Sequence, residues 1–217
     1  MREAKIRSSS QALVSDMARE RVLVLLGDSN FHYCPKESCL STLFWSPGKS
    51  MGNMVRTKLP GRVILAYEHK IGETDWSNVQ SSLDTLKSLC PDTEVHVLFL
   101  CGQNDAHSLR NKRTRNFEDV RAKFRQLVER QMKKLEELIP YATIYWVIPF
   151  DDPKTKVDPS FGPQYEALVK EIADAISLKE RAITFGPFSS FQPDMVHLAT
   201  TDRTNFANQV LDWFANL

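Results

Sequence analysis

Five short apolar runs, separated by stretches with helical periodicity, constrain this chain more than any other feature. The first run covers residues 21–26 and ends at Gly27. The others cover residues 62–67, 94–101, 143–149 and, more weakly, 181–185. Continuous apolar runs of this length that end at glycine or proline are typical of buried parallel strands. Strands that alternate with helices predict an α/β fold, with a parallel sheet between two helical layers.

The segments between the runs have the periodicity of amphipathic helices. The clearest extends from about Asn116 to Ile139, where apolar residues recur every three or four positions. Asn116 is a suitable N-cap, and Pro140 follows the expected end of the helix. We expect further helices near residues 50–59, 76–89, 161–178 and 203–216. These helices would supply the crossovers that parallel strands require.

Composition fits a single globular domain without a strong charge bias. The chain has 217 residues, of which 42% are hydrophobic, and its formal net charge is +1. A net charge near zero argues against a partner attracted by charge over the whole surface. The chain contains no apolar stretch of the roughly 18 residues that a membrane helix needs. We expect residues 1–20 to be a lead or linker and residues 21–217 to form the domain.

The first twenty residues also bear on location. They are too polar to be a secretory signal peptide. We therefore expect an intracellular protein, cytoplasmic or nuclear, or a domain excised from a longer chain.

The four cysteines are Cys34, Cys39, Cys90 and Cys101, and no two have C-x-x-C spacing. We expect them to be reduced thiols in a reducing compartment. A zinc site with His32, Cys34 and Cys39 as ligands would have the wrong spacing for the common types. We therefore expect no metal site.

Polar residues with catalytic potential follow the predicted strands. Ser29 comes directly after the first strand, Gly72 after the second and Asn104 after the third. Asp194 and His197 follow the last strand. Because parallel strands direct their carboxyl ends to one edge of a sheet, we expect these residues to converge there.

This set of residue types suits nucleophilic catalysis. A serine hydroxyl becomes a nucleophile when a base removes its proton, and a histidine titrates in the suitable range. We expect Ser29 to be the nucleophile, His197 the base and Asp194 the group that orients the imidazole. The backbone N–H groups of Ser29 and Gly72 and the side-chain amide of Asn104 would then form the oxyanion hole.

Each motif taken alone also fits an ordinary local structure. Ser29 could cap a helix, and residues 102–105 could form a common strand-to-helix turn. Asp194 and His197 could cap the last helix, although Thr201 or Asp202 would be the better cap. The motifs occur together, in order and each at a predicted strand end, and this favours a shared site.

The same motifs carry a family resemblance. G-D-S at residues 27–29, a glycine at position 72, G-x-N-D at 102–105 and D-x-x-H at 194–197 together resemble the four sequence blocks of SGNH, or GDSL-like, hydrolases. The resemblance implies a flavodoxin-like three-layer α/β/α sandwich with strand order 2-1-3-4-5. It also implies hydrolysis of an ester or thioester through an acyl-enzyme, without a metal or organic cofactor.

The sequence departs from this pattern at some positions. Asn30 and Phe31 follow the nucleophile where many members carry an apolar residue, and Gln103 stands where many have threonine. Gly72 is the weakest of the four matches. We expect Asp28, Asn30 and His107 to contact the substrate, whose acyl and leaving groups stay open.

A cluster of basic residues precedes the longest predicted helix. It contains Arg110, Lys112, Arg113 and Arg115. This cluster could bind RNA or an anionic lipid, or it could be a solvated loop balanced by the acidic helix start. In lacking a signal peptide, the chain is also similar to the SGNH-like esterase domains encoded in the first open reading frame of some non-LTR retrotransposons. The alternative function is therefore a binding module on the same fold.

Overall fold

The computed structural model describes residues 21–31, 50–67, 76–89, 91–105, 117–150, 153 and 181–217. These ranges form a five-stranded parallel sheet with the order β2-β1-β3-β4-β5. The strands are β1 (Arg21–Gly27), β2 (Val63–Tyr67), β3 (Glu94–Leu100), β4 (Ala142–Val147) and β5 (Ala182–Ile183). Each of the five predicted strands is present, and the expected order 2-1-3-4-5 is confirmed.

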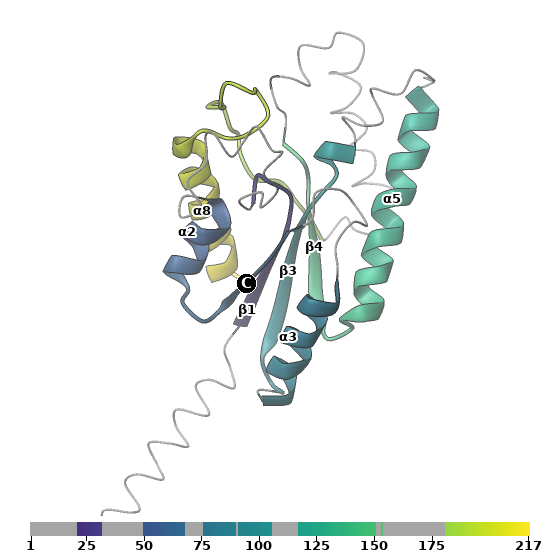
Figure 1. Ribbon diagram of the computed structural model, residues 1–217, viewed down its shortest axis with the longest axis vertical. Helices are drawn as coiled ribbons and strands as arrows, with labels where there is room; N and C mark the ends of the chain where they lie inside the picture. The colour runs from purple at the N-terminus through teal and green to yellow at the C-terminus, as the bar shows by residue number, and fades with distance from the viewer. Residues whose placement is uncertain are drawn as a thin grey trace, which may run out of the picture.

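Helices cover both faces of this sheet, as Figure 1 shows. They are α2 (Met51–Lys58), α3 (Trp76–Leu89), α5 (Phe117–Leu138) and α8 (Thr200–Ala215). The helices α2 and α8 lie on one face, and α3 and α5 lie on the other. The three-layer α/β/α architecture is thus confirmed. The helix expected near residues 161–178 falls outside the described residues.

The start of α8 differs from the prediction. The helix begins at Thr200, and its N-cap is Ala199, which makes no side-chain capping hydrogen bond. Thr201 and Asp202 lie inside the first turn, so the expectation that one of them caps the helix is wrong. Asp202 instead accepts hydrogen bonds from a neighbouring loop.

The core consists of two apolar layers, one on each face of the sheet. Alternate residues of β1 point to opposite faces, as the pleat of a strand requires. Leu23 and Leu25 pack with residues of α2 and α8, whereas Val24 and Leu26 pack with residues of α3 and α5. Both faces of β1 are therefore buried, which explains why its sequence is continuously apolar.

Strand register brings the ends of the central strands together. Gly27, the last residue of β1, pairs with Tyr67 on β2 and with Leu100 on β3. The segments after β1 and β3 consequently leave the sheet side by side. The residues that carry the catalytic motifs begin at this edge.

Other expectations concern membrane and metal binding. No helix in the described ranges has the length and apolar character needed to cross a bilayer. Within the same ranges, no three His, Cys, Asp or Glu residues gather as metal ligands would. Cys101 is buried and not in a disulfide. The other cysteines, His32 and residues 1–20 lie outside the described part of the chain, so the domain boundary stays a prediction.

Candidate active site

A tight turn at the end of β1 presents Ser29. The turn is closed by a hydrogen bond from the Phe31 N–H to the Asp28 carbonyl, at 3.1 Å. The Asn30 N–H also donates to Asp28 Oδ1, at 2.9 Å. Gly27 is required before the turn, because a Cβ there would lie 2.4 Å from the carbonyl oxygen of Leu100. Close approach of two strands therefore explains the glycine before the serine.

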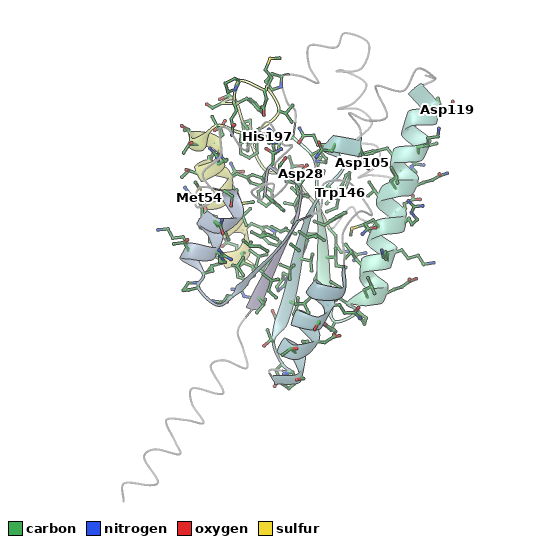
Figure 2. The ribbon with its side chains drawn as sticks, viewed as in Figure 1. Asp28, Met54, Asp105, Asp119, Trp146 and His197 are labelled. Atoms are coloured by element: carbon green, nitrogen blue, oxygen red, sulfur yellow. The ribbon has the colours of Figure 1, made fainter. Side chains whose placement is uncertain are left out.

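Three side chains join into a chain of hydrogen bonds at this turn. Ser29 Oγ lies 2.7 Å from Nε2 of His197, across 168 residues of sequence. On the other side of the imidazole, Nδ1 of His197 contacts Oδ2 of Asp194. Figure 2 shows His197 near Asp28 at the end of the sheet where β1 and β3 terminate. The structure thus brings together the serine, histidine and aspartate that the sequence predicts.

A compact loop places the side chains of Asp194 and His197 beside each other. Asp194 Oδ1 accepts hydrogen bonds from the N–H groups of Val196 and His197, both at 3.0 Å. The Gln192 N–H donates to the His197 carbonyl at 2.7 Å. Met195 has a positive φ of 59°, a conformation that non-glycine residues rarely adopt outside tight turns. These contacts allow two residues three positions apart to face each other.

The loop also fixes the charge of Asp194. Burial by itself would raise the pKa of this carboxyl group. Hydrogen bonds from the His197 side chain and from the backbone N–H groups of His197 and Val196 outweigh burial and lower the pKa to about 2. Asp194 is therefore a carboxylate at neutral pH, as a partner for an imidazolium should be.

The segment after β3 supplies Asn104. Gly102 has a φ of 126°, and a Cβ there would lie 2.8 Å from the ring of Phe124. Residues 103–105 are helical. Nδ2 of Asn104 lies 3.5 Å from Oδ2 of Asp28, the residue before Ser29. The side-chain amide predicted to bind the oxyanion is thus beside Ser29, and its role stays a prediction.

Two residues expected to contact substrate are buried among protein groups. Asp28 and Asn30 are each about 1% exposed. Asp28 accepts from the backbone of Asn30 and from the side chain of Asn104. The Asn30 amide contacts Gln103 and the N–H of Leu198. These contacts favour a positioning role for both residues over direct contact with substrate.

Spacing in the sequence did not point to Gln103 or Asp202. Gln103 is about 1% exposed and bonds to Asn30, so two of the three departures from the family pattern contact each other. Oδ2 of Asp202 accepts from the N–H groups of Ser189 and Ser190, at 2.7 and 2.6 Å. The signal for Gln103 was its place inside the third motif, whereas the sequence marked Asp202 only as a possible cap of the last helix.

The remaining candidate residues lie outside the described part of the chain. They are Gly72, His107, Arg110, Lys112, Arg113 and Arg115. Contributions of Gly72 to the oxyanion hole, of His107 to substrate binding and of the basic cluster to RNA or lipid binding stay predictions.

Comparison with known proteins identifies the fold. No model of a protein family matches the chain, and no curated protein matches its sequence. Among solved structures, the chain is similar to an acetyl xylan esterase from the rumen bacterium Butyrivibrio proteoclasticus, with 14% identity and a TM-score of 0.56. That match covers 91% of this chain and 64% of the esterase, so the chain spans less than two thirds of its length.

Two further structures match over nearly their whole length. One is an aryl esterase from M. smegmatis, with 15% identity, a TM-score of 0.56 and coverage of 91% of this chain and 99% of the esterase. The other is a carbohydrate acetylesterase from Sinorhizobium meliloti, with 19% identity, a TM-score of 0.53 and the same two coverages. A GDSL-like lipase from Parabacteroides merdae also matches, with 16% identity, a TM-score of 0.52 and coverage of 88% of this chain and 93% of the lipase. The chain therefore has the fold of SGNH, or GDSL-like, hydrolases.

Proposed function

We propose that this chain is a serine esterase that hydrolyses a carboxylic ester through an acyl-enzyme. The observation that carries the proposal is the contact of 2.7 Å between Ser29 Oγ and His197 Nε2, with Asp194 on the far side of the imidazole. A histidine in this position can remove the serine proton as the hydroxyl attacks. The SGNH fold of the chain supports the same chemistry, although a fold alone does not determine a reaction.

In the first half of the reaction, Ser29 Oγ attacks the ester carbonyl carbon and His197 Nε2 takes the hydroxyl proton. Asp194 stabilises the resulting imidazolium and keeps Nδ1 protonated. The negative charge on the carbonyl oxygen is bound by the N–H of Ser29 and the amide of Asn104, with Gly72 as a third donor. His197 then gives its proton to the leaving alcohol, and the acyl group stays on Ser29.

In the second half, water replaces the alcohol. His197 removes a proton from the water as it attacks the acyl carbon, and returns that proton to Ser29 Oγ as the acid departs. The free enzyme is regenerated, and one ester and one water yield one acid and one alcohol. The steps need only the residues named and water.

The test is hydrolysis of p-nitrophenyl esters from acetate to decanoate. We expect wild type to turn over and Ser29→Ala to lose activity by about 10⁴-fold or more, because the nucleophile is gone. Ser81→Ala, an exposed serine on α3, is the matched control and should retain full activity. Equal activity of wild type and Ser29→Ala would refute the proposal, and the chain-length optimum reports the preferred acyl group.

The oxyanion hole is tested in the same assay. Asn104→Ala should lower kcat by about 10²–10³-fold, since it removes one donor to the transition state. A rise in KM without a fall in kcat would instead assign Asn104 to substrate binding.

A further inference from the structure

Two buried side-chain amides connect the histidine loop to the ends of the central strands. The Leu198 N–H donates to Asn30 Oδ1 at 3.3 Å. Nδ2 of Asn30 donates to Oε1 of Gln103 at 3.2 Å. Nε2 of Gln103 in turn lies 3.5 Å from the carbonyl oxygen of Phe150, beyond the end of β4. We call this series of hydrogen bonds the amide relay.

The amide relay has a fixed direction. It starts at a backbone N–H, which can only donate, and ends at a backbone carbonyl, which can only accept. Each side-chain amide must therefore present its oxygen toward the Leu198 end and its nitrogen toward the Phe150 end. Both amides are about 1% exposed, so water does not readily replace a lost partner. Loss of one member would leave buried polar groups without partners.

The relay lies next to both reacting side chains along the chain. Asn30 directly follows Ser29, and Leu198 directly follows His197. The bond between Asn30 and Leu198 thus joins the backbone of the nucleophile turn to the backbone of the histidine loop. Gln103 supports Asn30 from the segment after β3, one residue before Asn104.

We infer that Asn30 and Gln103 are positioning residues that set the place of His197 relative to Ser29. The inference rests on the proposed esterase function. The described hydrogen bonds of the two amides run to Leu198, to each other and to Phe150, so both act through the loop backbone. A displacement of about 1 Å in a catalytic group can cost about 100-fold in rate. Leucine is the informative replacement, because it keeps approximate size but can neither accept from Leu198 nor bond within the relay.

Kinetics of leucine variants test the inference. Asn30→Leu and Gln103→Leu should each lower kcat by about 10–100-fold while KM changes by less than about threefold. The double variant should resemble the worse single variant, since one break already interrupts the relay. Gln131→Leu, a buried glutamine on α5, is the matched control and should keep the wild-type kcat.

Gln103→Glu separates the relay from a general packing effect. When protonated, the new carboxyl can accept from Asn30 and donate to the Phe150 carbonyl, which preserves the direction of the relay. When ionised, it places negative charge against that carbonyl. The ratio of the variant's kcat to that of wild type should therefore fall as the pH rises. A ratio independent of pH would contradict the relay.

Hydrogen exchange at the Leu198 amide gives a readout that does not depend on activity. We expect the Leu198 amide to be protected from exchange in wild type. In Asn30→Leu its protection should fall at least about tenfold, while the protection of core amides of β3 stays unchanged. If Asn30→Leu does not fold, kcat and the protection of the Leu198 amide are both measured in Gln103→Glu at low and high pH.

The outcomes separate the two proposals. Wild-type kcat in both leucine variants, or unchanged protection of Leu198, would overturn the positioning role and leave the esterase intact. Failure of wild type to hydrolyse any ester would overturn the proposed function. In that case, lost protection in Asn30→Leu would still support the link between the two loops, and retained protection would overturn it.

Discussion

The two carboxylate oxygens of Asp194 have different hydrogen-bond partners. Oδ2 faces Nδ1 of His197, while Oδ1 accepts from two backbone N–H groups of its own loop. The backbone contacts hold the carboxylate in one orientation, and the carboxylate then orients the imidazole. The same contacts keep the pKa of Asp194 at about 2, so the carboxylate stays charged at neutral pH.

Asp194→Asn should lower kcat by about 10³–10⁴-fold with the fold intact. An asparagine can present its amide nitrogen to Nδ1, which favours the wrong imidazole tautomer. Steady-state hydrolysis of the best p-nitrophenyl ester measures the effect. Asp212→Asn, an exposed aspartate on α8, serves as the control. A loss of less than about tenfold at Asp194 would exclude it as the orienting residue.

Gly27 has no space for a side chain. Gly27→Ala would bring a Cβ to 2.4 Å from the Leu100 carbonyl and 2.8 Å from the Phe31 ring, so we expect a loss of about 3 kcal/mol or more in unfolding free energy. Gly61→Ala is the control. Gly61 has a positive φ, of 76°, but a Cβ there would have no atom within 4 Å. Gly61→Ala should cost about 1 kcal/mol in urea unfolding. Equal losses would contradict the steric argument.

Residue types and order were sufficient to predict that Ser29, His197 and Asp194 lie together, because strand ends in a parallel sheet converge. The partners of Asp28, Asn30 and Gln103 could not be predicted in this way. Their hydrogen bonds depend on which side-chain atoms meet after three loops pack, and no spacing rule encodes that. We expected Asp28 and Asn30 to contact the substrate, and the structure shows both side chains buried and hydrogen-bonded to protein groups.

At the scale of elements, α8 connects to the triad through the loop before it. Oδ2 of Asp202 accepts from the N–H groups of Ser189 and Ser190. The phenylalanines of this region also pack around Phe206 of α8, with ring centroids of Phe185 and Phe188 at 5.3 and 5.2 Å. The helix and the loop that leads to Asp194 thus form one packed unit.

Asp202→Ala should lower the free energy of unfolding by about 1–3 kcal/mol, because two backbone N–H groups lose a charged acceptor. Urea unfolding measures the change. Asp119→Asn, an exposed aspartate in the first turn of α5 seen in Figure 2, should cost only a few tenths of a kcal/mol. If both variants lost the same free energy of unfolding, the hydrogen bonds from Ser189 and Ser190 to Asp202 would not stabilise the fold.

The central strands β1 and β3 were predictable because burial on both faces makes their sequences continuously apolar. The start of α8 was not, since its cap is an alanine and the aspartate suited to capping is used by the loop at 189–190. Local preference at Asp202 was overridden by a tertiary contact.

At the scale of the whole molecule, His96 and Asp194 link stability to pH in separate ranges. His96 is buried between Tyr145 and Phe214, and burial lowers its pKa from 6.5 against the opposing effect of Glu94. The unfolded chain therefore takes up a proton at His96 before the folded one does, and stability falls as the pH drops below 6.5. The pKa of Asp194 is lowered from 3.8 to about 2, so this group contributes stability above pH 3.8. That stability is lost as the pH falls toward about 2.

Urea unfolding across this range should therefore show two separable effects. His96→Leu should flatten the decline of stability just below pH 6.5, whereas Asp194→Asn should flatten it only below about pH 4. A wild-type curve without slope between about pH 6.5 and 5, or a His96→Leu curve identical to it, would contradict the account of His96.

Covalent labelling of Ser29 tests the central claim most directly. The protein would be treated with a fluorophosphonate, which phosphonylates activated serines, and the modified peptide identified by mass spectrometry. We predict one adduct on the peptide that contains Ser29, no adduct in Ser29→Ala, and labelling slowed by at least about 100-fold in His197→Ala. An adduct that persists in Ser29→Ala, or a wild-type protein that takes up no label, would contradict the assignment of Ser29 as the nucleophile.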